Sequence, residues 1–211
     1  MGSVVDSGEK VSSVSGLIGV CDLPGNSDIS TMALALASAA GGDSEIRRCS
    51  AAPAVLSFEA SLRELGIQTT RDAEVVTVKG GSIKAPEGSL SAGGGCVHFS
   101  CLAGLLSGAS FRTHFMANHG EMDVDASIEG LRSLGASFSL PAEGVFPLKL
   151  GGRNLTAGKY SIASPSSAVK CAMFLAALSV DGNVELNQGT AGEDDLEVLF
   201  RAAGCRIDKS R

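Results

Sequence analysis

The apolar positions of the chain fall into short helical and strand-like segments that recur in the same order. Three of these segments carry apolar residues at helical spacing and end in a glycine. They are Leu62–Ile67 (LRELGI), Leu131–Ala136 (LRSLGA) and Phe200–Cys205 (FRAAGC). Their glycines, Gly66, Gly135 and Gly204, are 69 residues apart each time. Because glycine can adopt the positive φ that ends a helix, each segment predicts a helix end followed by a short strand.

A second shared segment precedes each of these helices. It is rich in Leu and Ala, stops at glycine, and starts at Ala33 (ALALASAAGG), Cys101 (CLAGLLSGAS) and Ala172 (AMFLAALSVDG). The repeated unit is therefore helix, strand, helix, strand. A period longer than about 50 residues indicates repeated units that share one core, rather than a solenoid of short repeats. Small residues allow close helix approach, which favours helices packed inside a shell of sheets.

The pattern predicts a single α/β domain of three βαβα(ββ) units at about 11–80, 88–150 and 151–211, after a disordered polar tail at 1–10. Strands are expected at Val11–Asp22 and at Cys205–Asp208, the latter closing the third unit. The hairpin that ends the first two units is cut short in the third.

Composition narrows the possible partners. The 211 residues are 44% hydrophobic, enough for one real core, and the formal net charge is −6 without a Lys/Arg run. Nucleic acid is therefore not expected as a partner. No apolar run approaches ~18 residues and the N-terminus lacks a hydrophobic signal core, so no membrane association and a cytoplasmic location are expected. The six cysteines lack CxxC spacing, which favours reduced thiols over disulfides or zinc.

Four segments, taken in order, resemble the enolpyruvyl transferases, the family of EPSP synthase. LPGNSDISTMALALASAA resembles LPGSKSxSNRALLLAALA, and AGGGCVHF resembles NAGTAMRF. NHGEMDVDASIEGLRSLGA resembles RMRxRPIGDLVDALRxLGA, and SPSSAVKCAMFLAAL resembles SxSSQFLTALLLAAPL. The resemblance covers nearly the whole chain but only one of the family's two domains. It implies an inside-out α/β domain with three inward-facing parallel helices and outer sheets.

The chain departs from the family motifs mainly at positions where the family has lysine or arginine. Ser27 and Asp28 stand where the family has Lys-Ser, and Met32, His98 and Asn118 stand where it has arginines. The phosphate and carboxylate groups of the family's substrates need such cations for binding. The family's second domain supplies further catalytic groups. We therefore expect that this chain does not transfer enolpyruvyl groups from phosphoenolpyruvate by itself.

The family geometry brings the first turns of the three inward helices together on one face. A histidine beside a carboxylate there forms an acid/base pair, so Asp28, His98 and His119 are the predicted catalytic residues. Pairing would raise the histidine pKa, whereas burial alone would lower it. No cofactor and no metal are expected, since HxxxH or HxH spacing is absent. The predicted substrate-binding residues are Ser27, Gly94, Gly95, Asn118, Glu121, Ser166, Ser167 and Lys170.

Two hypotheses about function follow. In the first, the cleft binds a small molecule without phosphate and catalyses its isomerisation, cyclisation or elimination. In the second, the chain is a non-catalytic binding or structural subunit. An exposed apolar face then pairs it with a second chain or with a copy of itself. Two positions have an alternative to ligand contact. Gly93–Gly95 can be a turn that only lets strand and helix pack closely, and His98 can be a solvated side chain.

Overall fold

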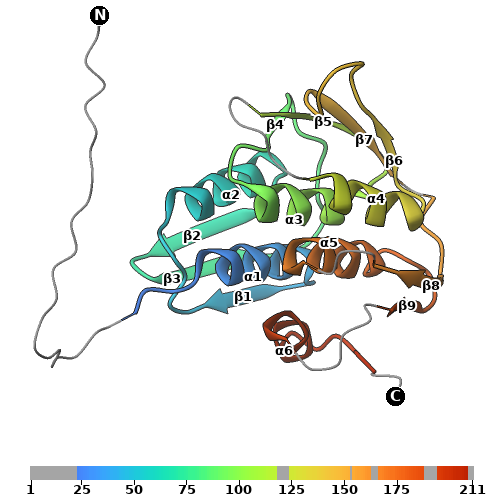
Figure 1. The fold of residues 1–211 in the computed structure, drawn as a ribbon. Coiled ribbons are helices and arrows are strands. Elements are labelled where there is room, and N and C mark those ends of the chain that lie inside the picture. Colours follow the sequence, from blue (N-terminus) through green and yellow to red (C-terminus); the bar gives the residue numbers. More distant parts are fainter. Residues whose placement is uncertain (1–22, 118–123, 153, 163–165, 188–193, 209–211) are drawn as a thin grey trace, which may run out of the picture.

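The computed structural model describes residues 23–117, 124–152, 154–162, 166–187 and 194–208 (Figure 1). The predicted tail at 1–10 and the predicted strand Val11–Asp22 lie outside these residues. In the described part, helices and three separate sheets alternate along the chain, as expected for an α/β fold.

The first unit contains a three-stranded sheet with its last strand in the middle. Helix α1 (Ser27–Ala39) leads to β1 (Asp43–Ile46), and α2 (Pro53–Glu64) leads to β2 (Gln68–Asp72) and β3 (Val75–Lys79). Strand β3 pairs antiparallel with both β1 and β2. The apolar residues of β3 alternate with polar ones, so one face of the sheet is buried against the helices.

The second unit repeats this arrangement and adds one strand. Strand β7 pairs antiparallel with both β5 and β6, and β4 lies parallel to β5 at the edge. The hairpin predicted at the end of the second unit is confirmed as the β6–β7 pair. The elements are β4 (Leu90–Ser91), α3 (Cys96–Leu106), β5 (Arg112–Met116), α4 (Asp125–Ser133), β6 (Ser137–Ser139) and β7 (Leu148–Gly151).

The third unit has a smaller sheet. Strand β8 (Gly158–Ser161) leads to α5 (Ser167–Ala177), and β9 (Val184–Asn187) leads to α6 (Asp195–Ala202). Strands β8 and β9 pair in parallel, as β4 and β5 do. The strand predicted at Cys205–Asp208 is wrong: this segment forms no strand, because no strand of the described residues lies beside it to accept its hydrogen bonds.

The three glycines end their helices in the same way. Gly66, Gly135 and Gly204 have φ of +82°, +110° and +88° and follow α2, α4 and α6. In each case the next residue's amide donates to the carbonyl five residues earlier, at 2.9 to 3.0 Å, which is the Schellman ending. The helix ends predicted from the glycine spacing are confirmed.

The core lies between α1, α3 and α5, with the sheets outside them (Figure 1). Helices α3 and α5 pack closely because Gly104 faces the backbone of Ala172; a Cβ atom at Gly104 would lie 2.5 Å from the Ala172 carbonyl oxygen. Small residues therefore set the spacing of the inner helices, as the sequence predicted. In the described part of the chain, no helix has the length and apolar character needed to cross a membrane.

Candidate functional site

The start of α1 is capped by its own chain and tied to the loop after β1. The Asn26 side chain accepts a hydrogen bond from the Ile29 amide at 2.9 Å. Ser27 Oγ lies 3.5 Å from Ser50 Oγ, and Ser30 Oγ accepts from the Ser50 amide at 3.0 Å. Asp28 is exposed in the first turn, where the helix dipole favours a negative charge.

The loop that carries Ser50 is held by a buried ion pair. Glu59 on α2 is completely buried and accepts two hydrogen bonds from Arg71 on β2. Arg71 also donates to the carbonyl oxygens of Cys49 and Ser50, at 3.2 and 3.0 Å. Burial alone would lower the pKa of Arg71, but the hydrogen bond and charge of Glu59 raise it above its ordinary value.

The ion pair between Glu59 and Arg71 was not predicted from the sequence. The Glu59–Arg63 pair has the four-residue spacing of a helical ion pair, and Arg63 donates to Glu59 at 3.2 Å. Such spacing is typical of an ion pair on a helix surface. It could not show that Arg71, from a strand, is the closer partner and that it fixes the loop beside α1.

The start of α3 is a close-packed glycine turn. Gly95 has φ +103° at the N-cap position, and no side chain caps this helix. A Cβ atom on Gly94 would lie 2.0 Å from His98 Nδ1, so only glycine leaves room for the imidazole ring. The packing interpretation of Gly93–Gly95 therefore has direct support at Gly94.

His98 lies in the interior, 1% exposed, against α2. Its Nε2 lies 3.4 Å from Ser61 Oγ, and its ring packs edge-on against Phe58 with centroids 5.2 Å apart. Burial lowers the pKa of His98 to about 4, and hydrogen bonds with the backbone at Ala54 and Ser91 oppose this only in part.

These contacts correct the predicted role of His98. The expected rise in its pKa is wrong, because burial without a charged partner favours the neutral ring. No hydrogen bond or ion pair joins His98 to Asp28 in the described structure. His98 is a packed interior side chain rather than an acid/base group that a ligand can reach.

Two thiols meet where α3 and α5 pack together. Cys101 Sγ lies 3.6 Å from Cys171 Sγ, and both side chains are completely buried. Both are free thiols. Burial raises the pKa of Cys101, and Cys171 and the charge of Asp28 add to the shift. These cysteines therefore act as small apolar residues of the helix contact.

The start of α5 supplies a helix cap and a buried lysine. Ser166 Oγ accepts from the Val169 amide at 3.3 Å, and Ser167 is exposed beside it. The Lys170 ammonium group lies 2.7 Å from Asp194 and 2.5 Å from Glu197, and its side chain is 4% exposed. The charge of Lys170 is thus paired inside the protein with Asp194 and with Glu197 on α6, and its predicted substrate-binding role stays a prediction.

The ion pair with Lys170 also changes the pKa of Asp194, the N-cap residue of α6. The Asp194 side chain accepts from the Glu197 amide at 3.0 Å and so caps the helix. Burial alone would raise the pKa of Asp194, but the hydrogen bond from Lys170 lowers it below its ordinary value. The acidic residues at this helix start are therefore structural.

The remaining predicted residues lie outside the described part of the chain. They are Asn118, His119 and Glu121, so their predicted roles stay predictions. Of the predicted catalytic residues, only Asp28 is both described and exposed.

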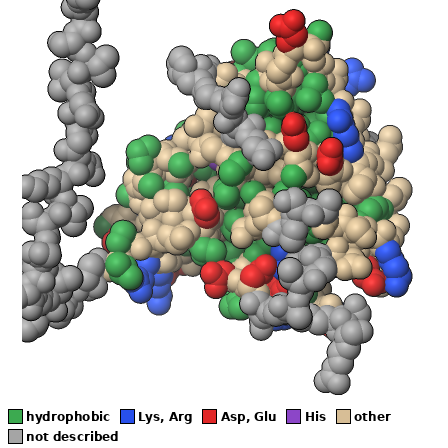
Figure 2. All heavy atoms as spheres, in the orientation of Figure 1, with side chains coloured by type: hydrophobic (Ala, Val, Ile, Leu, Met, Phe, Trp, Pro, Cys, Tyr) green, Lys and Arg blue, Asp and Glu red, His purple; other side chains and the backbone are tan. Residues whose placement is uncertain are grey.

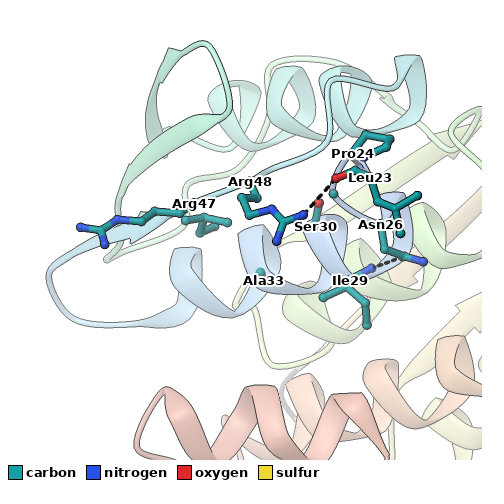
Figure 3. Close-up of a pocket in the computed structure, with 10 residues that line it drawn as sticks. Leu23, Pro24, Asn26, Ile29, Ser30, Ala33, Arg47 and Arg48 are labelled. Carbon is teal, nitrogen blue, oxygen red and sulfur yellow. Dashed lines mark hydrogen bonds between the residues drawn. The ribbon is translucent and has the colours of Figure 1, made fainter. Parts of the chain in front are cut away.

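A groove of about 400 Å³ lies between the start of α1 and the end of β1 (Figure 3). Arg48 Nη2 donates to the Leu23 carbonyl oxygen at 3.0 Å within it, and the guanidinium group points toward that carbonyl. Arg47 points away from the groove and pairs with Glu45. The predicted site residues that the structure describes do not line this groove.

The face of the molecule drawn in Figure 2 carries side chains of both charges. Figure 2 shows acidic side chains near the middle of one face, with Lys and Arg side chains mostly toward its edges. Among the described residues, no group of three or more His, Cys, Asp or Glu side chains is placed to hold a metal ion.

Comparisons with known proteins agree on one family. The model of the family described as EPSP synthase (3-phosphoshikimate 1-carboxyvinyltransferase) matches residues 10–211. The 3-phosphoshikimate 1-carboxyvinyltransferase of Solibacter usitatus is 26% identical over 208 residues, covering 96% of this chain and 49% of that protein. The Dichelobacter nodosus protein of the same name is 30% identical over 203 residues, covering 94% of this chain and 45% of that protein.

A solved structure shows the same fold. An EPSP synthase from Acinetobacter baumannii superimposes with a TM-score of 0.82 at 22% identity, covering 91% of this chain and 46% of that one. The chain thus spans about half the length of the relatives that it matches.

Proposed function

Because the chain belongs to the EPSP synthase family, we propose that it serves as one domain of a two-domain assembly and does not transfer enolpyruvyl groups by itself. In this proposal the part of the protein given by these residues is a non-catalytic binding or structural unit that pairs with a second unit. The matched part of each relative corresponds to a single domain, which supports the one-domain role.

One observation carries the proposal: two of the ionisable groups expected at the helix starts, His98 and Lys170, are turned toward the interior. His98 is buried and neutral at pH 7, and Lys170 is paired with Glu197. The exposed groups that remain at the starts of α1 and α5 are Asp28 and Ser166 with its neighbour Ser167. Phosphate and carboxylate groups need cations in direct contact, and Asp28 would repel them.

The alternative, acid/base catalysis on a molecule without phosphate, has less support. Burial removes His98 from the predicted catalytic group, which leaves Asp28 with His119. A carboxylate and a histidine can still exchange protons when they meet near neutral pH. The pairing of Asp28 with His119 stays a prediction of the sequence.

Calorimetric titration tests the proposal. We expect no saturable heat when the purified chain is titrated with 3-phosphoshikimate or with phosphoenolpyruvate, because Ser27, Met32 and the buried His98 stand where the family motifs have cations. The full-length Dichelobacter nodosus relative serves as the positive control under the same conditions. Saturable binding of 3-phosphoshikimate by the chain alone, at micromolar concentration, would contradict the proposal.

A further inference from the structure

Two cysteines from different inner helices lie side by side in the interior. Cys101 on α3 and Cys171 on α5 are 70 residues apart in the sequence, and their Sγ atoms are 3.6 Å apart. Both side chains are 0% exposed, and both are free thiols. Buried cysteines pack as small apolar residues, but two thiols in contact can also react with each other.

The close packing of α3 on α5 places the two thiols together. Gly104 follows Cys101 by about one helical turn and faces Ala172, the residue after Cys171. A Cβ atom at Gly104 would lie 2.5 Å from the Ala172 carbonyl oxygen, so a larger residue would push the helices apart. The thiols therefore meet where a glycine lets the two backbones approach each other.

The distance between the sulfur atoms is short enough for a cross-link. A disulfide needs its two sulfur atoms about 2.0 Å apart. Starting from 3.6 Å, a shift of about 0.8 Å by each sulfur reaches this distance. Small rotations about the two Cα–Cβ bonds can supply such a shift at the cost of modest rotamer strain.

Three other described cysteines have different surroundings. Cys49 Sγ accepts a hydrogen bond from Arg71 Nη2 at 3.4 Å. Cys96 is exposed as the first residue of α3, and Cys205 is half-buried after α6. Among the described cysteines, contact between two sulfur atoms thus distinguishes Cys101 and Cys171.

The packed core slows the reaction of these thiols and also directs its outcome. Burial raises the pKa of Cys101, so this thiol keeps its proton near neutral pH, and the thiolate is the reactive form. A bulky reagent is excluded, whereas a small oxidant can enter when the helices open locally. Once one sulfur is oxidised, the other lies beside it, which favours a disulfide over further oxidation.

We propose that Cys101 and Cys171 form a redox-sensitive pair, which hydrogen peroxide converts into a disulfide between α3 and α5. The peroxide oxidises one thiol to a sulfenic acid and is reduced, releasing one water. The second thiol attacks the sulfenic sulfur, the S–S bond forms, and the hydroxyl group leaves with a proton as a second water. A dithiol reductant reverses the reaction.

The disulfide joins two of the three inner helices and fixes the spacing of their starts. Gly94 and Gly95 lie immediately before α3, and Ser166 and Ser167 lie at the start of α5. These are positions that the sequence analysis predicted to bind a ligand. The inference does not depend on the proposed function, because it concerns only the contact between two described helices.

Peptide mapping tests the cross-link. The purified chain is treated with hydrogen peroxide, the remaining thiols are blocked with N-ethylmaleimide, and trypsin digestion follows without a reductant. Peptides 85–112 and 171–201, which contain Cys101 and Cys171, should appear joined and two hydrogens lighter than their sum. Because peptide 85–112 also contains Cys96, the variant Cys96→Ala should keep the joined product and Cys101→Ala should lose it.

Thermal unfolding gives a second readout in the same samples. A disulfide that closes a loop of 70 residues should raise the unfolding midpoint by about 10 °C over the reduced chain. Dithiothreitol should remove this rise. Cys96→Ala should retain the difference between oxidised and reduced protein, whereas Cys101→Ala and Cys171→Ala should lose it, whatever their own midpoints.

Oxidation of the chain unfolded in urea is the control for geometry. There the cysteines should pair in several combinations, because nothing holds Cys101 beside Cys171. The inference is overturned if peroxide modifies the exposed Cys96 of the folded chain and leaves peptides 85–112 and 171–201 unlinked. The same mixture of pairings from folded and unfolded chains would also overturn it.

Discussion

The ammonium nitrogen of Lys170 lies 2.5 Å from a carboxylate oxygen of Glu197, and the two side chains are 4% and 5% exposed. The pair joins α5, one of the three inner helices, to α6, which follows β9 along the chain. A charge buried in this way contributes to the packing of the two helices and is not available to a ligand.

Neutralising one partner of this pair should destabilise the fold. Glu197→Gln leaves the buried ammonium group with Asp194 as its acidic partner, so we expect a loss of about 2–3 kcal/mol in the free energy of unfolding. Urea denaturation measures it. Glu185→Gln is the matched control, because its ion pair with Lys159 is exposed and should contribute less than about 0.5 kcal/mol. Equal losses in the two variants would contradict the structural role of Lys170.

The buried His98 should make stability depend on pH. Its pKa is about 4 in the folded chain and about 6.5 when unfolded, so between these values the unfolded state binds a proton that the folded state does not. Stability is therefore greatest above pH 6.5 and falls as the pH drops toward 4. The expected loss between pH 7.5 and pH 5 is about 2 kcal/mol.

Unfolding curves of two histidine variants at several pH values check this assignment. His98→Gln should flatten the pH dependence in this range, whatever its effect on stability at pH 7.5. His114→Gln, which replaces an exposed residue of β5, should retain the full dependence. If the two variants had the same pH dependence, His98 would not be the responsible group.

The glycines that end α4 and α6 should differ in their tolerance of a side chain. Both have positive φ, so alanine strains either position by about 1 kcal/mol. At Gly135 the new Cβ would also lie 2.1 Å from the Asn154 carbonyl oxygen, whereas at Gly204 nothing lies within 4 Å. Thermal unfolding should show Gly135→Ala to be clearly less stable than Gly204→Ala, and the reverse order would contradict the packing described for α4.

Shortening a buried side chain of the inner helices should lower the free energy of unfolding far more than shortening an exposed side chain of α6. Leu102→Ala and Leu175→Ala empty positions that are 0% and 1% exposed, so each should lower the free energy of unfolding by about 2–5 kcal/mol. Val198→Ala, at an exposed position, should change it by less than about 0.5 kcal/mol. Urea denaturation of the three variants compares them directly, and a small effect at Leu102 would argue against an inner-helix core.

The fold could be predicted because its signals are local and repeated. Gly66, Gly135 and Gly204 fix the ends of three helices at equal spacing, and glycine has a backbone reason to occupy each end. Small residues such as Gly104 indicate close helix contacts without specifying the partner. The strand expected at Cys205–Asp208 was wrong because a strand needs a neighbour, which a local pattern cannot show.

The candidate site was harder to predict because side-chain direction is a tertiary property. His98 and Lys170 both lie in the first turn of a helix that the family comparison placed at a ligand face. In the structure each turns toward a neighbouring helix, His98 to Ser61 on α2 and Lys170 to Glu197 on α6. The sequence shows which residues can ionise, but the partner that buries or pairs them lies on another element.

The most direct test of the central claim is a phosphate-release assay with 3-phosphoshikimate and phosphoenolpyruvate. The purified chain is compared with the full-length Solibacter usitatus relative at equal concentration. We expect no release above the enzyme-free background from the chain alone, since Ser27, Met32 and the buried His98 stand where the family motifs have cations. Sustained release by the chain alone would show that a single domain suffices for the reaction and would contradict the account.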